Sequence, residues 1–217
     1  MKKRRRNILI IIAVLIIICI ALVVYFFRVD LSKKKDEEVS NPSYIDIIKG
    51  YDYTLEERDT KLFKDTYYQL KEVLSSSEIN YEEYAKLLSE LYVIDLYTID
   101  NKFDKYDVGA TEYIYTDGVE NFILKVDDTI YKYVEDYKDG KRKQDLPIVE
   151  SITVSSVEEE KFQIGEEELD GYKVNVKWEY KEDLDYDTEA IINLVKKDDK
   201  LYIVSQTNTE DEKEEQK

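Results

Sequence analysis

The segment YKVNVKWEY, residues Tyr172–Tyr180, carries the clearest structural signal in this 217-residue chain. Apolar and aromatic side chains alternate in it with lysine, asparagine and glutamate. Side chains of a β-strand point to opposite faces in turn, so the alternation predicts a strand with one buried and one solvated face. A strand of this kind is typical of an antiparallel sheet that is covered on one side only.

Three more runs rich in β-branched and apolar residues are interpreted as strands on either side of it. A turn between the first two strands is expected at Leu169-Asp170-Gly171, and a tight turn between the last two at Asp198-Asp199-Lys200. The three additional strands are Leu146–Val157, Ala190–Val195 and Leu201–Gln206.

Three helices are predicted before the strands, because apolar residues there recur every three or four positions. Asp59 or Thr60 is the expected N-cap of the first helix. Asn80, with Glu83 three residues later, resembles a capping box at the start of the second. The expected helices cover residues 60–74, 80–98 and 117–134.

Helices followed by antiparallel strands predict an α+β domain over residues 44–207, with three helices packed on the apolar face of a four-stranded sheet. At its start, Ile45–Ile48 is compatible with a short helix or a short strand. Residues 29–43 are interpreted as a charged linker. Residues 208–217 have almost no apolar side chain and are expected to form a disordered acidic tail.

An uncharged apolar run, Ile8–Phe27, predicts a transmembrane helix, because twenty residues span about 30 Å. Basic residues 2–6 precede it, so residues 1–28 are interpreted as a cytoplasmic stub and a membrane anchor, with the rest extracytoplasmic. A cleaved signal peptide fits less well, because its apolar region is shorter and ends in small residues. Cys19 follows three isoleucines, which makes lipidation there a poor alternative.

The composition restricts the chemistry. The chain has no histidine and one cysteine, which excludes histidine-dependent catalysis, an intrachain disulfide and a thiolate zinc site. Its net charge of −17 argues against a nucleic-acid partner. No cofactor and no enzymatic activity are expected. An enzyme that uses carboxylates alone is the remaining catalytic alternative.

The element order resembles the nuclear transport factor 2-like superfamily, which has helices first and a curved antiparallel sheet last. The segment KLYIVSQ, Lys200–Gln206, is similar to the usual final strand of that superfamily. With one N-terminal membrane helix, the layout also resembles single-pass assembly proteins of type IV secretion and conjugation systems. The resemblance covers about residues 50–207. It implies a cone-shaped fold that serves enzymes, binders and scaffolds alike.

The segment Asp107–Tyr115 combines glycine, small residues and aromatic residues between two helices. Cone-shaped folds can hold a ligand where helices and sheet diverge. Tyr113, Tyr115 and Trp178 are therefore candidate residues of a pocket or interface, with a place in the core as the alternative.

Asp183, Asp185 and Asp187 alternate in the loop after the clearest strand. Alternate carboxylates on an extended backbone can converge on a hard cation, which makes them candidate cation ligands. Thr188 and Leu194, however, stand where an EF-hand calcium loop has glycine and glutamate. A solvated hairpin tip is the preferred interpretation.

Two acidic runs, Glu158–Glu160 and Glu166–Glu168, flank Phe162 and Ile164 and suggest either a docking surface for a basic partner or a charged hairpin. The sequence as a whole predicts an interaction or assembly module of the bacterial cell envelope. It is expected to bind another envelope protein or a second copy. The alternative is an extracytoplasmic module that binds a small ligand or a cation.

Overall fold

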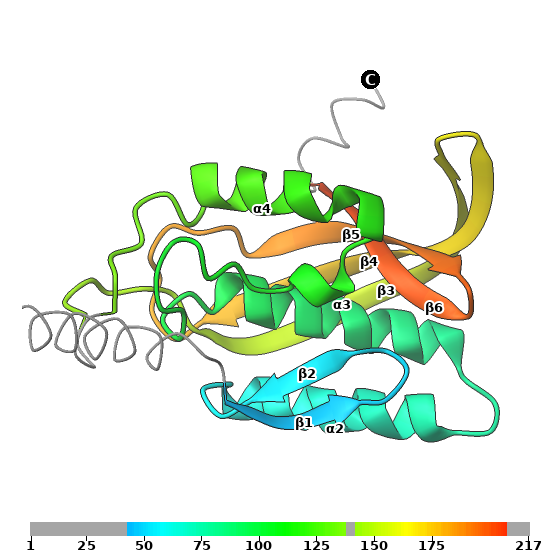
Figure 1. The fold of residues 1–217 in the computed structure, drawn as a ribbon, viewed down its shortest axis with the longest axis horizontal. Coiled ribbons are helices and arrows are strands. Elements are labelled where there is room, and N and C mark those ends of the chain that lie inside the picture. Colours follow the sequence, from blue (N-terminus) through cyan, green and yellow to red (C-terminus); the bar gives the residue numbers. More distant parts are fainter. Residues whose placement is uncertain (1–42, 138–141, 208–217) are drawn as a thin grey trace, which may run out of the picture. The chain divides into compact units, whose positions relative to one another are not determined.

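A computed structural model describes residues 43–137 and 142–207, which belong to one compact unit that begins at Ser43 (Figure 1). These residues form an α+β fold: a small β-hairpin, three α-helices and a four-stranded antiparallel sheet. The predicted anchor Ile8–Phe27, the predicted linker up to residue 42 and the predicted tail 208–217 lie outside the described residues. Within them, no helix is long and apolar enough to cross a membrane.

The sheet follows the order of the chain, and each strand is antiparallel to the next. The alternation predicted for Tyr172–Tyr180 is confirmed, because Val174, Val176 and Trp178 are buried while Lys177 is exposed. The strands are β3 (Val149–Ile164), β4 (Glu167–Tyr180), β5 (Glu189–Lys197) and β6 (Lys200–Thr207).

The turn predicted at Leu169-Asp170-Gly171 is wrong. Strands β3 and β4 continue past this point as a long hairpin, and the chain reverses at Gly165, where a φ of +61° favours glycine. Gly171 lies inside β4. A Cβ atom there would lie 2.0 Å from the carbonyl oxygen of Leu194 and 2.9 Å from the ring of Phe162. The glycine therefore marks a close approach of two strands.

The other predicted turn is confirmed. Asp198 and Asp199 have φ values of +50° and +60° and form the two-residue connection between β5 and β6. Two successive residues with positive φ match the twist of the flanking strands.

The predicted helices are present, and the N-caps Thr60 and Asn80 are confirmed. The Thr60 hydroxyl accepts a hydrogen bond from the backbone N–H of Phe63 at 3.2 Å, and the Asn80 side chain accepts one from Glu83 at 3.1 Å. The helical segments are α2 (Lys61–Ser75), α3 (Tyr81–Tyr97), the 3-10 turns η1 (Thr111–Tyr113) and η2 (Thr116–Gly118), and α4 (Val119–Asp128).

Helix α4 is shorter than the predicted 117–134. It ends at Asp128, because Thr129 has a non-helical backbone with ψ of −96°. The chain then turns so that Tyr131 is fully buried and its hydroxyl donates a hydrogen bond to the carbonyl of Leu96 at 2.8 Å. Apolar residues keep their helical spacing past the end of α4 because the following non-helical segment also faces the core. The sequence pattern does not distinguish such a segment from a helix.

The open question about Ile45–Ile48 is decided in favour of a strand. Strand β1 (Tyr44–Ile48) pairs with β2 (Tyr53–Glu56) in a separate two-stranded sheet. Tyr53 and Leu55 of β2 are each 1% exposed, so the hairpin covers the core with its second strand. The four-residue length of β2 is too short to show a clear period in the sequence.

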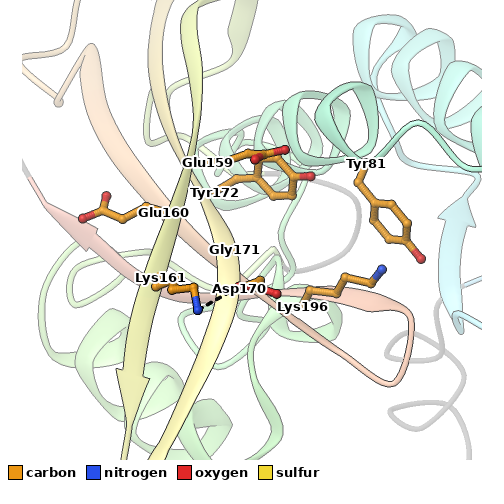
Figure 2. A pocket seen from close by; sticks show the side chains of 8 residues that line it. All are labelled: Tyr81, Glu159, Glu160, Lys161, Asp170, Gly171, Tyr172 and Lys196. Atoms are coloured by element: carbon orange, nitrogen blue, oxygen red, sulfur yellow. Dashed lines mark ion pairs between the residues drawn. The ribbon is translucent and has the colours of Figure 1, made fainter.

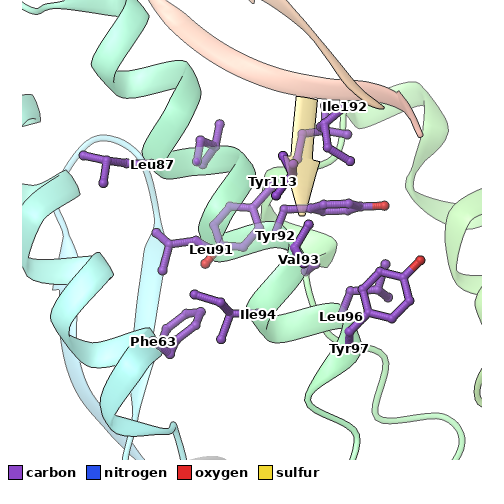
Figure 3. Packing of buried hydrophobic residues seen from close by; sticks show 14 of the residues in the cluster. Phe63, Leu87, Leu91, Tyr92, Val93, Ile94, Leu96, Tyr97, Tyr113 and Ile192 are labelled. Carbon is purple, nitrogen blue, oxygen red and sulfur yellow. The ribbon is translucent and has the colours of Figure 1, made fainter. Parts of the chain in front are cut away.

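Helix α3 is the centre of the core. It contacts α2, β3, β4 and β6, and eleven of its 17 residues are buried. Figure 3 shows Phe63 of α2 and Ile192 of β5 on different sides of this helix. A helix that is apolar nearly all round belongs in the interior, and the sheet and the other elements therefore pack around it.

Candidate functional site

A groove of about 900 Å³ lies between α4 and β6, and we call it the α4–β6 groove. Its lining comes from the C-terminal half of α3, the segment 114–118, α4 and the residues just after it, and β6, with single contributions from the end of β3 and from the loop between β4 and β5. The helix side provides Phe122, Val126 and Ile130. The strand side provides five consecutive residues, Ile203–Thr207. A partly apolar concave surface of this kind is the usual form of a binding site.

The α4 wall of the groove is set by helical spacing. Phe122 and Val126 are four residues apart and share one face, with Val126 only 4% exposed. The ring of Phe122 lies 6.1 Å from the ring of Tyr92 on α3, which attaches α4 to the central helix. At the rim, Asn121 is exposed and lines the groove, whereas its neighbour Glu120 is exposed and does not.

Three polar side chains are tied together on the floor of the groove. Tyr92 donates a hydrogen bond to the Gln206 side-chain oxygen at 2.9 Å, and the Gln206 nitrogen donates one to the Tyr97 hydroxyl at 2.6 Å. Both tyrosines extend from α3 away from Phe63 (Figure 3). Burial, opposed by the Gln206 hydrogen bond, raises the pKa of Tyr97 to about 12, so it stays neutral. These groups satisfy each other and make a fixed floor.

Of the three aromatic residues predicted from the sequence, the structure places only Tyr115 on the groove. Tyr113 is fully buried, and its ring lies 5.3 Å from the ring of Tyr53. Trp178 is 3% exposed and packs against Tyr97 with ring centroids 4.8 Å apart. Tyr113 is therefore a core residue. Trp178 is almost fully buried, supports the groove floor from behind, and also lines a separate hollow on the sheet.

Sequence reasoning missed Gln206 and the groove face of α4. Period-two alternation from Leu201 and Ile203 would place Ser205, not Gln206, on the inner face. Only the β-bulge at Val204 brings Gln206 there, so no pattern in the sequence pointed to it. The face of α4 gave no signal of its own, because apolar residues at helical spacing look the same whether they meet a core or a groove.

The outer edge of β6 is covered along its first part. The hydroxyl of Tyr53 donates to the Leu201 carbonyl at 3.2 Å, and the Leu201 N–H donates to the Tyr84 hydroxyl at 3.3 Å. Further on, the Tyr115 N–H donates to the Ile203 carbonyl at 2.9 Å. Among the described residues, no element other than β5 is hydrogen-bonded to the backbone of 204–207.

The three aspartates proposed as cation ligands lie in the loop between β4 and β5. Asp185 has a φ of +59°, and its N–H donates to the Asp183 side chain at 3.2 Å. Asp187 lines the α4–β6 groove, whereas Asp183 lines a different hollow of about 800 Å³ on the sheet. The described part of the chain contains no group of three acidic, histidine or cysteine side chains placed to hold a metal ion.

The acidic runs lie on the extended β3–β4 hairpin, where a hollow of about 520 Å³ faces the start of α3 (Figure 2). Lys161 forms ion pairs with Glu168 at 2.9 Å and Asp170 at 3.7 Å. Lys196 lies 3.6 Å from the ring centre of Tyr81. Lysines thus compensate part of the acidic charge, and the hairpin is a surface of mixed charge.

Several partly buried carboxyl groups lie away from these hollows, beside the β1–β2 hairpin. Glu112 accepts hydrogen bonds from the backbone and hydroxyl of Thr54 at 2.9 and 2.8 Å. Asp95 accepts hydrogen bonds from Lys102 and from the Ala110 N–H. None of these residues lines any of the three hollows described above. We therefore assign this cluster to stability.

Two partly buried carboxyl groups predict that the protein loses stability as the pH rises. Burial raises the pKa of Glu112 to about 7 and that of Asp59 to about 6, from 4.5 and 3.8. The folded state binds these protons more tightly, so their stabilisation is complete below about pH 4 and is lost as the pH passes 7. Urea unfolding is expected to give a lower free energy of unfolding at pH 8 than at pH 5.5. Glu112→Gln should flatten this dependence.

Asp107 provides a control, because its pKa is shifted in the opposite direction. Burial opposes the shift, but the hydrogen bond from Arg58 lowers the pKa of Asp107, so its contribution changes only below pH 3.8. Asp107→Asn should lower stability by a similar amount at pH 5.5 and pH 8. An unchanged slope in Glu112→Gln would show that Glu112 is not the responsible group.

No protein-family model, curated protein or solved structure matches this chain. The inference of function therefore rests on the groove and on charge. The described residues include 19 lysines and arginines against 39 aspartates and glutamates, a net charge of −20. A field of this sign repels anionic partners and favours cationic ones.

Proposed function

We propose that residues 44–207 form a protein-interaction module of the bacterial cell envelope, held at the membrane by Ile8–Phe27 and binding its partner through the α4–β6 groove. The single observation that carries the proposal is the groove itself, with an apolar wall on α4 and an open strand edge on β6. The order of helices and sheet supports the resemblance to the nuclear transport factor 2-like superfamily, which we keep as part of the proposal.

The lining favours a segment of another protein over a small molecule. Tyr92, Tyr97 and Gln206 already bond each other, so they offer few free polar groups to orient a small ligand. The rest of the lining combines an apolar wall with the strand 203–207 and, apart from these, charged side chains such as Asp117, Lys125 and Asp187, a mixture that suits a polypeptide. The groove is also open along a strand, so a segment could lie in it without the chain opening.

Cross-linking in cells tests this function. A photoreactive amino acid in place of Asn121, at the rim of the groove, is expected to capture one or two recurrent envelope proteins from the full-length chain. The same group in place of Glu120, one residue away and also exposed, is expected to capture them at least about tenfold less, because Glu120 lies outside the groove. Mass spectrometry of the adducts identifies the partner and the contact peptide.

Two outcomes would contradict the proposed function. Equal capture from both positions would show that α4 meets its neighbours at random. No capture from Asn121 or from Lys125, a second exposed residue of the groove, would show that the groove has no protein partner in the cell.

A further inference from the structure

The proposed function can be made more specific, and the following inference rests on it. We propose that the α4–β6 groove takes an extended peptide segment that carries lysine or arginine. The segment adds to the free outer edge of β6, with its apolar side chains against α4 and its basic side chains near the two ends of the groove. The partner is thus identified by its backbone conformation and its charge.

The register of the sheet shows which backbone groups of β6 are free. Lys197 and Lys200 flank the two-residue turn, and their backbones form the first hydrogen-bonded pair of the ladder. Along β5 the backbone N–H and C=O groups of successive residues point to opposite neighbours, so those of Ile191 point toward β6 and those of Ile192 toward β4. Gln206 pairs opposite Ile192. Its N–H and C=O therefore face away from β5, at the outer edge of the sheet.

A β-bulge separates the covered and uncovered parts of this edge. Leu194 lies opposite Ile203 and Asn193 lies opposite Ser205, which leaves Val204 as an extra residue in β6. Before the bulge, the outer edge is bonded to tyrosine hydroxyls and to Tyr115. Five consecutive residues, from Ile203 before the bulge to Thr207 after it, line the groove, so the groove runs along the edge of the strand.

The chain itself demonstrates the mode of binding at this edge. Ile114 forms a parallel β-bridge with Ile203, and Tyr115 donates its N–H to the Ile203 carbonyl. The chain then turns away through η2 into α4, and the groove continues without it. A peptide that continues along β6 from this bridge would form hydrogen bonds with the backbone N–H and C=O of Gln206. This is strand addition over a few residues.

Charge determines which peptide is favoured. Asp117, two residues after Tyr115, lines one end of the groove, and Asp187 lines it near the Gln206 end, where its charge helps to raise the pKa of Tyr97. Lys125 is the one basic residue among the lining side chains. A second copy of a domain with a charge of −20 would be repelled, whereas a basic segment is attracted. The neutral floor and the apolar wall then bind its apolar side chains.

Selection from random peptides tests this inference. A phage-displayed library of 12-residue peptides is selected on the full-length chain in detergent micelles. Enriched peptides are expected to carry at least two basic residues and apolar residues at alternate positions. One of them is then synthesised with a fluorescent label, and its dissociation constant is measured by anisotropy at low and at high salt. Bound peptide should slow hydrogen exchange of the Gln206 amide.

Two double variants with the same change of net charge separate the groove from the overall field. Asp117→Lys with Asp187→Lys should weaken binding of the peptide by about tenfold or more. Glu120→Lys with Asp128→Lys, at exposed positions of α4 outside the groove, should change it by less than about threefold.

Equal weakening by both pairs, enrichment without basic residues, or unchanged exchange at Gln206 would each overturn the inference. If peptides fail while cross-linking from Asn121 captures a partner, the interaction function stands and the extended basic peptide is excluded as the ligand. If cross-linking also fails, the proposed function fails with it.

Discussion

Substitution of Gly171 by alanine is expected to lower the free energy of unfolding by about 3 kcal/mol or more. A Cβ atom at this position would lie 2.0 Å from the backbone oxygen of Leu194 and 2.9 Å from the ring of Phe162. The backbone oxygen belongs to the neighbouring strand β5, so relief of the clash requires the two central strands of the sheet to separate. Thermal unfolding followed by circular dichroism measures the effect.

Gly118→Ala is the matched control for this substitution. A Cβ atom at Gly118 would have its nearest neighbour, the Ile114 side chain, at 3.6 Å, and its φ of −98° is open to any residue. We expect a change below about 1 kcal/mol there. Similar losses from both substitutions would contradict the close approach of β4 and β5.

The second large effect is expected from Asp95. Asp95→Ala should cost about 3–5 kcal/mol, because it leaves the ammonium group of Lys102, whose side chain is 2% exposed, buried without its partner. The same carboxylate accepts a hydrogen bond from the N–H of Ala110, which has a left-handed backbone with φ of +63°. One side chain thus supports both the buried charge and the turn into η1. Urea unfolding measures the loss.

Two comparisons identify the cause of this loss. The double variant Asp95→Ala with Lys102→Met should recover part of the stability, because no uncompensated charge remains in the core. Asp65→Ala breaks an exposed ion pair with Lys61 and should cost about 0.5 kcal/mol or less. If the double variant were no more stable than Asp95→Ala, the loss would come from the turn at Ala110 and not from the charge.

Elements with strong local signals were predicted correctly. Thr60 and Asn80 were recognised as N-caps because a cap acts within three residues, and the turn at Asp198-Asp199 was recognised for the same reason. Gly171 was misread as part of a turn. Glycine is used in turns that need a positive φ, and also inside strands where a neighbouring strand comes too close for a side chain. At Gly171 only the nearby backbone of Leu194 shows that the second role applies.

The candidate site was much less predictable than the fold. Tyr115 was singled out for its local composition and lies on the groove, but Tyr113, two residues earlier, is fully buried. Gln206 acquires its role from Tyr92 and Tyr97, which lie more than a hundred residues earlier in the chain. Such a contact depends on how α3 crosses the sheet, and no local pattern records that crossing.

The sequence by itself determined the α+β class, the order of helices and strands, the inward face of β4 and the acidic charge, because period, caps and composition act over a few residues. Only the tertiary structure decided that α3 fills the core, that Gly171 of β4 lies close against the backbone of β5, and that part of the β6 edge stays unpaired among the described residues. Those features depend on packing between distant segments. A groove exists only where two such segments fail to fill the space between them.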